Sequence, residues 1–156
     1  MGRIIKITKS IIGKFNWKDI KNNLIKYLKK IIVIKENNVE IKIDRKFIKE
    51  YLGSQYTAYS SKKIKSIKAN MSLHIVDIIE NAGHIKKEKN VESKHNIDAW
   101  QGFEKYKARF EYVTKDEFNN DISTIYSCIL ILRCPNTYEK YLYDIVGIKK
   151  ETSNPQ

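Results

Sequence analysis

The chain has 156 residues, 42% of them hydrophobic, which is enough for one core and argues against a two-domain enzyme. The formal net charge of +12, from 30 Lys plus Arg against 18 Asp plus Glu, favours an anionic partner such as nucleic acid or a lipid surface. The apolar runs are far shorter than the roughly 20 residues that span a bilayer, and no signal-peptide pattern opens the chain. Cys128 and Cys134 lack the spacing of a disulfide framework or a metal site, so we expect a cytoplasmic protein without stable membrane insertion.

The basic charge is concentrated in the first half of the chain. Residues 1–35 carry a net charge of +9, residues 36–95 carry +4, and residues 96–156 carry −1. Such a polarised field steers a polyanion onto one side of a domain, although Lys-rich helix surfaces are also common solvated faces.

The first predicted element is an amphipathic helix from Trp17 to Ile32, with Asn16 as its N-cap and a Lys-rich outer face. We interpret residues 1–38 as a basic N-terminal helical extension. Residues 32–35 and 39–43 alternate in hydrophobicity around a polar turn, which predicts a short hairpin. Asp44 then caps a short helix that ends at Gly53.

The clearest helical pattern begins after Ser61 and runs to about Ala82, where Gly83 is a natural stop. Its apolar side chains recur at spacings of three and four residues. At about 100° per residue, a set of polar side chains borders this apolar stripe. They are Lys63, Asn70, His74, Asp77 and Asn81.

The second half of the chain switches to period two, which is typical of strands. We predict strands over Phe103–Val113, Ile122–Arg133 and Tyr141–Ile148, joined as an antiparallel meander because their connections are too short for crossover helices. The predicted class is α+β, with N-terminal helices packed on a roughly four-stranded antiparallel sheet. We assign residues 39–150 to one α+β domain and residues 151–156 to a flexible tail.

The usual enzyme signatures are missing from this sequence. It has no phosphate-binding glycine loop, no nucleophile elbow and no metal-binding helix motif, and the spacing of its three histidines matches no standard zinc site. We therefore expect no metal and no cofactor. The residue types that remain suit metal-free RNA cleavage, in which the ribose 2′-OH attacks its own phosphate and needs a base, an acid and cations.

Several side chains are placed by the predicted elements to serve that chemistry. Lys107 and Arg109 share one face of the first long strand, and Thr124 or Tyr126 and Tyr141 or Tyr143 project from its neighbours. His84 follows a helix stop and His95 lies in a polar loop, where side chains reach grooves. Each also has a plainer interpretation: His74 as a hydrogen-bonded boundary residue, His95 as a solvated loop residue, the tyrosines as packing, and Arg109 as half of a cross-strand ion pair.

Three segments resemble a known superfamily: residues 71–82, ending in Asn81-Ala82, the strand at residues 106–112 with Arg109, and Tyr141-Leu142-Tyr143-Asp144-Ile145. Over roughly residues 39–150 the chain resembles phage- and mobile-element-associated members of the barnase, EndoU, colicin and RelE-like nucleases. The resemblance implies helices on a four-stranded antiparallel sheet and metal-independent ribonuclease activity on tRNA or mRNA, in a toxin or phage effector. It places His74 and Asn81 on the helix side of the site, and Arg109 and Tyr143 on the sheet.

From these arguments together, the predicted catalytic residues are His74, Arg109, Tyr143 and His95. The predicted nucleic-acid-binding residues are Lys63, Asn81, His84, Lys107 and Tyr126. Besides RNA, the expected partners are a cognate immunity protein or a host protein complex.

Two other hypotheses use the same charge. The first alternative is a non-catalytic binding module that mimics or competes with nucleic acid, such as a phage-encoded inhibitor of a host defence complex. Such a module needs no histidine. A weaker alternative is peripheral membrane attachment through the helix at residues 17–32.

Overall fold

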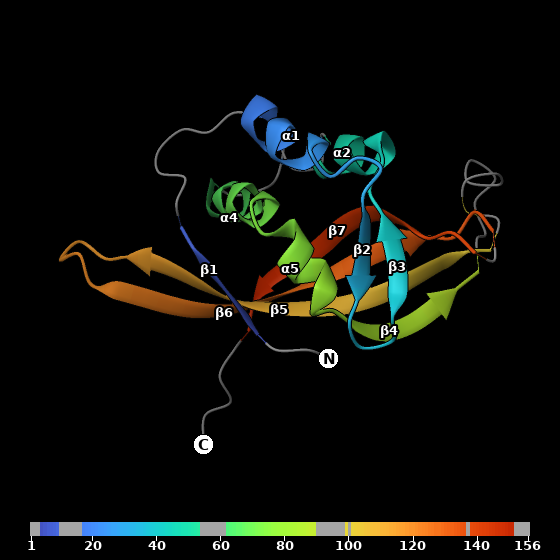
Figure 1. Cartoon of the computed structure of the whole chain (residues 1–156). Helices are drawn as coiled ribbons and strands as arrows, with labels where there is room; N and C mark the ends of the chain where they lie inside the picture. Colours follow the sequence, from blue (N-terminus) through green and yellow to red (C-terminus); the bar gives the residue numbers. More distant parts are fainter. Residues whose placement is uncertain are drawn as a thin grey trace, which may run out of the picture.

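The computed structural model describes residues 4–9, 17–53, 62–89, 99, 101–136 and 138–151. Figure 1 shows its four labelled helices and seven strands along the chain. The strands are β1 (Ile5–Thr8), β2 (Ile31–Ile34), β3 (Val39–Lys42), β4 (Gly83–Glu88), β5 (Phe103–Lys115), β6 (Asp121–Arg133) and β7 (Tyr141–Lys150). The helices are α1 (Trp17–Ile25), α2 (Arg45–Tyr51), α4 (Lys62–Ser72) and α5 (Ile75–Glu80).

All seven strands belong to one mixed sheet in the order β1-β5-β6-β7-β3-β2, and β4 also pairs with β5. The central strands β5, β6 and β7 are antiparallel, whereas β1 runs parallel to β5 and β3 runs parallel to β7. The sheet curls around the helices (Figure 1). The tip of the β2–β3 hairpin consequently reaches β4 and β5: the Asn37 amide donates to the Tyr106 hydroxyl at 2.9 Å, and the His84 backbone N–H donates to Glu36 at 2.8 Å.

This architecture corrects the predicted fold class. The helices do not pack on a four-stranded antiparallel sheet; they lie inside a curled, seven-stranded mixed sheet. The prediction missed β1 and β4, which have only four and six residues and pair along the same side of β5, at residues 110–113 and 103–107. Strands this short stand out only when a tight turn joins them to a partner, as in the β2–β3 hairpin, whereas the partner of β1 lies about a hundred residues away in the sequence.

Several local predictions are confirmed. The β2–β3 hairpin and the β5–β6–β7 meander are present, and the Asp44 carboxylate accepts the Phe47 N–H at 3.2 Å as the N-cap of α2. The long helix predicted to end at Ala82 is instead two helices, α4 and α5, with His74 at the N-cap of the second. The first helix ends at Ile25, and its predicted last turn is part of β2.

The core fills the space between the concave face of the sheet and the helices. Alternate residues of β5 and β6 point inward and are buried, and they meet the apolar faces of all four helices. Residues 1–38, predicted as a helical extension, contribute β1 and β2 to the same sheet as residues 39–150. Helices α1 and α2 lie side by side (Figure 1); α1 also packs on α4, whereas α2 packs directly on β7.

Candidate nucleic-acid interface

Helices α1 and α2 turn their charged faces away from the core. The α1 residues Ile20 and Leu24 are buried, as are Phe47, Ile48 and Tyr51 of α2. We call residues 17–30 and 44–51 the basic helix layer, because they carry eight basic and three acidic residues. Its exposed cations are Lys18, Lys21, Lys26, Lys29, Lys30, Arg45, Lys46 and Lys49.

The turn after α1 concentrates this charge around one aromatic ring. The ammonium groups of Lys26 and Lys30 lie 5.3 and 5.8 Å from the centroid of the half-buried Tyr27 ring. Lys29 adopts a φ of 67°, a left-handed conformation that is uncommon for a side chain other than Gly or Asn. Backbone strain of this kind costs on the order of 1 kcal/mol and is often found at functional sites. A fixed aromatic ring among cations is a platform on which an unpaired base can stack.

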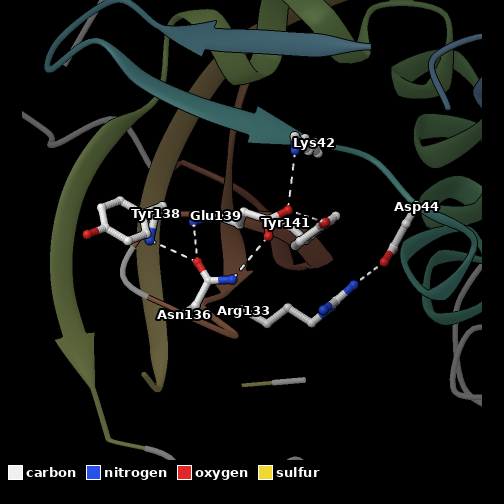
Figure 2. Close-up of polar contacts among 7 residues, drawn as sticks. All are labelled: Lys42, Asp44, Arg133, Asn136, Tyr138, Glu139 and Tyr141. Carbon is white, nitrogen blue, oxygen red and sulfur yellow. Dashed lines mark hydrogen bonds and ion pairs between the residues drawn. The ribbon is translucent and has the colours of Figure 1, made fainter. Parts of the chain in front are cut away.

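The N-terminal end of α2 is held against the sheet by an ion pair. Asp44, whose other oxygen caps the helix, binds the guanidinium of Arg133 at the end of β6. Figure 2 shows this pair beside Tyr141, whose ring centroid lies 4.4 Å from the Arg133 guanidinium carbon. The Arg133 side chain is only 5% exposed, so the pair fixes where the first turn of α2 begins.

A second group of contacts in Figure 2 fixes the β6–β7 connection next to this ion pair. The Glu139 carboxylate accepts hydrogen bonds from the Tyr141 hydroxyl at 2.7 Å, the Asn136 amide at 3.1 Å and the Lys42 ammonium at 3.3 Å. These three bonds favour the charged carboxylate and lower the pKa of Glu139 to about 2. These three bonds join β3 to the β6–β7 connection and to β7.

The C-terminal end of α2 is held by a buried lysine of α4. The Lys68 ammonium donates to the Tyr51 carbonyl at 2.8 Å and lies 3.9 Å from the Tyr51 ring centroid, while the Tyr51 hydroxyl donates to the Lys68 carbonyl at 2.8 Å. Lys68 is fully buried. Burial lowers the pKa of Lys68 to about 7, and the negative charge of Asp144 opposes this shift. Helix α2 is therefore anchored at both ends, so the backbone positions from which its cations project are fixed.

The predicted site residues of the helical region do not project into one site. His74 is a half-buried residue between α4 and α5, and Lys63 is exposed on the first turn of α4. Asn81 is buried at the C-cap of α5, where its side-chain amide donates to the Asp77 carbonyl at 2.8 Å. His74 lies at the boundary of the buried stripe, and its side chain makes no capping hydrogen bond to α5.

Lys107, Arg109 and Tyr143 lie on the outer face of the sheet, with the core between them and the helices. Their strand neighbours Ala108 and Leu142 point inward and are buried. Arg109 makes two hydrogen bonds to Glu151, Nε at 2.8 Å and Nη2 at 2.6 Å, and this contact raises the pKa of Arg109. The Tyr143 ring packs on Phe103 at 5.8 Å between centroids.

Arg109 and Tyr143 are also far apart on that face. Arg109 lies opposite Ser127 of β6, whereas Leu142, the neighbour of Tyr143, lies opposite Leu132. Five residues along a strand correspond to about 17 Å. The structure therefore does not bring His74, Arg109 and Tyr143 together.

The remaining predicted residues are equally dispersed. Tyr126 points into the core, where its ring stacks on Phe110 at 5.8 Å between centroids and is buried. His84 is exposed on β4, with its ring edge-on to Tyr106 at 5.1 Å. His95 lies outside the described residues.

The predicted residue set included no cation from the basic helix layer. The signal was present in the sequence as the +9 charge of residues 1–35 and the Lys-rich face of the first helix. Metal-free RNA cleavage requires an acid and a base, so the predicted set consisted of histidines and strand residues instead. The sequence places Tyr27 between Lys26 and Lys30, and in the structure both ammonium groups lie over its ring.

No helix in the described part of the chain is both long and apolar enough to cross a membrane. Within the same residues, no three His, Cys, Asp or Glu side chains group closely enough to hold a metal ion. Comparison of the chain with protein-family models, with curated proteins and with solved structures finds no match.

Proposed function

We propose that this protein is a non-catalytic binding module that takes single-stranded RNA on its basic helix layer. The observation that carries the proposal is the outward display of eight cations on α1, the following turn and α2, two of which lie over the Tyr27 ring. Lysines at several phosphate positions supply affinity without sequence preference, and an aromatic ring among them favours unpaired bases.

The non-catalytic form of the proposal rests on where the ribonuclease candidates lie. General acid–base cleavage needs the acid, the base and the phosphate-binding cation within hydrogen-bond reach of one phosphate. His74 lies among the helices, whereas Arg109 and Tyr143 lie on the opposite face of the sheet. The RNA-binding proposal does not depend on membership of the barnase, EndoU, colicin and RelE-like nucleases. Nor does it depend on the immunity or host-protein partners that such membership implies.

The experiment is a charge reversal on the basic helix layer with a charge-matched control. We expect the variant K18E/K21E/K26E to lose most of its affinity for a fluorescent single-stranded RNA in fluorescence anisotropy. The slope of log K against log salt should fall by about 2, because each lost phosphate contact removes about 0.7 for a single strand. The control K6E/K87E/K150E makes the same net charge change at exposed positions on the strands β1, β4 and β7.

The same preparation tests cleavage and nucleic-acid type. Intact RNA after incubation in EDTA supports a binding module, and 2′,3′-cyclic phosphate ends would restore the ribonuclease hypothesis. Equal loss of affinity in the two triple variants would show that net charge alone, and not this surface, holds the RNA. Stronger binding to double-stranded DNA than to single-stranded RNA would contradict the role assigned to Tyr27.

A further inference from the structure

Two turns of the sheet hold an aromatic ring out in solvent. Tyr138, on the β6–β7 connection, is 93% exposed, and Phe118, on the β5–β6 connection, is 76% exposed. A polar side chain near its start fixes each turn. Asn136 Oδ1 accepts the Tyr138 N–H at 2.8 Å. In the same way, Asp116 Oδ1 accepts the Phe118 N–H at 2.8 Å. A ring on a fixed turn loses little backbone freedom when it binds a partner, so the construction of both turns suits an anchoring ring.

The charge around the two turns has opposite signs. Residues 115–121, which include Phe118, carry one basic and three acidic residues, a net charge of −2. The turn of Tyr138 belongs to residues 133–141, which lie against residues 42–46 at the junction of β3 and β7. These two segments together carry five basic and two acidic residues, a net charge of +3. A polyanion is therefore attracted to the turn of Tyr138 and repelled by the turn of Phe118.

The turn of Tyr138 also adjoins the basic helix layer. The Lys42 ammonium donates to Glu139, the residue after Tyr138, at 3.3 Å, and Lys42 is the register partner of Tyr141 (Figure 2). Three residues separate Tyr138 from Tyr141, and three separate Lys42 from Arg45, the first cation of α2. With about 3.6 Å per residue and about 4.8 Å between paired strands, the Cα atoms of Tyr138 and Arg45 are at most about 26 Å apart. A single strand that covers roughly 4–16 nucleotides, as on an OB fold, reaches both.

We infer that a single-stranded RNA on the basic helix layer continues past the N-terminal end of α2 to the β6–β7 connection, where an unpaired base stacks on Tyr138. The inference rests on the proposed function and adds to it a second stacking platform besides the half-buried Tyr27. Figure 2 shows the Tyr138 ring pointing away from the other labelled side chains, so its faces are open to a base. The two carboxylates beside the path, Asp44 and Glu139, are each paired with a cation, which limits their repulsion of a phosphate.

Fluorescence anisotropy with a single-stranded RNA of about 16 nucleotides tests this inference on the full chain. Tyr138→Ala should weaken binding at least about fivefold, the loss expected for one stacked base, and should leave the slope of log K against log salt unchanged because no phosphate contact is removed. Tyr138→Phe keeps the ring and should bind like the wild type. The matched control is Phe118→Ala, which removes an exposed ring from a turn of the same construction and should leave the affinity unchanged. Thermal unfolding checks that each variant is folded.

Crosslinking of the wild-type chain to RNA that contains 4-thiouridine is a second measurement, which needs no variant. Mass spectrometry should find the crosslink on Tyr138 and none on Phe118. Wild-type affinity in Tyr138→Ala, an equal loss in Phe118→Ala, or a loss that Tyr138→Phe shares overturns the inference. In those cases the proposed function stands, provided that the wild type binds RNA and K18E/K21E/K26E does not. A wild type that binds no RNA overturns the proposed function itself, and this inference with it.

Discussion

Substitution of the buried Lys68 by methionine should change how the stability of the protein depends on pH. Methionine has a similar volume and no charge, so it can fill the space against Tyr51 while it removes the ammonium group. The wild-type ammonium is fully buried, where it donates to the Tyr51 carbonyl, lies over the Tyr51 ring and is attracted by the negative charge of Asp144. Burial lowers its pKa to about 7 from the ordinary value of 10.5.

The sign of the effect follows from this lowered pKa. Below pH 7 the lysine is protonated in both states, and the folded state bears the full cost of the buried charge. Between pH 7 and 10.5 the folded state releases its proton while the unfolded state keeps it, so the free energy of unfolding rises with pH. At about 1.4 kcal/mol per pH unit, the wild type gains about 5 kcal/mol across this window, whereas the Lys68→Met variant does not.

Urea unfolding at pH 6, 7.5, 9 and 10.5 measures this difference. The informative quantity is the free energy of unfolding of the wild type minus that of Lys68→Met, because contributions from all other titrating groups cancel in it. We expect this difference to rise steadily from pH 7 upward. A difference that stays constant from pH 6 to 10.5 would refute the reasoning, since Lys68 would then keep its proton in the folded state. The double variant K68M/D144N serves as a control for the charge left on Asp144.

Three further predictions concern the parts that position and form the basic helix layer. Asp44→Ala should destabilise the protein by about 3 kcal/mol or more in urea unfolding, because it removes an N-cap and leaves the buried Arg133 guanidinium without this carboxylate. Asp44→Asn keeps the cap and should cost less. Between pH 4.5 and pH 2, the free energy of unfolding of Glu139→Gln should fall less than that of the wild type. The lowered pKa of Glu139 stabilises the folded state above pH 4.5, and this contribution disappears as pH falls towards 2. Identical acid unfolding of variant and wild type would contradict this prediction. Lys29→Gly should raise the free energy of unfolding by about 1 kcal/mol, because glycine adopts a φ of 67° without strain. It should also lower the slope of log K for RNA binding against log salt by about 0.7. A loss of stability would argue against the backbone strain.

The sequence predicted those elements whose signals are local. The meander is confirmed because its three strands are ten or more residues long, the outer two alternate, the middle one is apolar on both faces, and short connections join them. Asp44 was predictable as a helix cap because its side chain bonds a backbone N–H three residues later. In both cases the partners are near in the sequence or share a clear period.

The curl of the sheet depends on contacts that no local pattern contains. Strand β1 pairs with β5 across about a hundred residues, and β3 meets β7 through one register pair, Lys42 with Tyr141. The polar contacts that stabilise the curl, such as the hydrogen bond between Asn37 and Tyr106, join residues that no sequence motif links. The predicted fold class was wrong for this reason, although the helix and strand types in it were largely right.

The sequence predicted the basic charge of the candidate interface but not where that charge lies on the surface of the protein. The excess of lysine in residues 1–35 is visible in the sequence, yet its placement on one layer depends on how α2 packs beside α1. Lys68 illustrates the opposite case. It belongs to a lysine-rich helix and looks like another surface cation, but it is buried as the anchor of Tyr51.

The most direct test of the central claim is the acetylation rate of individual lysines, measured by mass spectrometry with and without a saturating single-stranded RNA. If the basic helix layer binds the RNA, Lys18, Lys21, Lys26 and Lys46 become protected. Lys107 and Lys149, on the face of the sheet that points away from the helices, then react at unchanged rates. Protection of the sheet lysines with no change on α1 and α2 would place the RNA on the opposite side of the molecule and contradict the account.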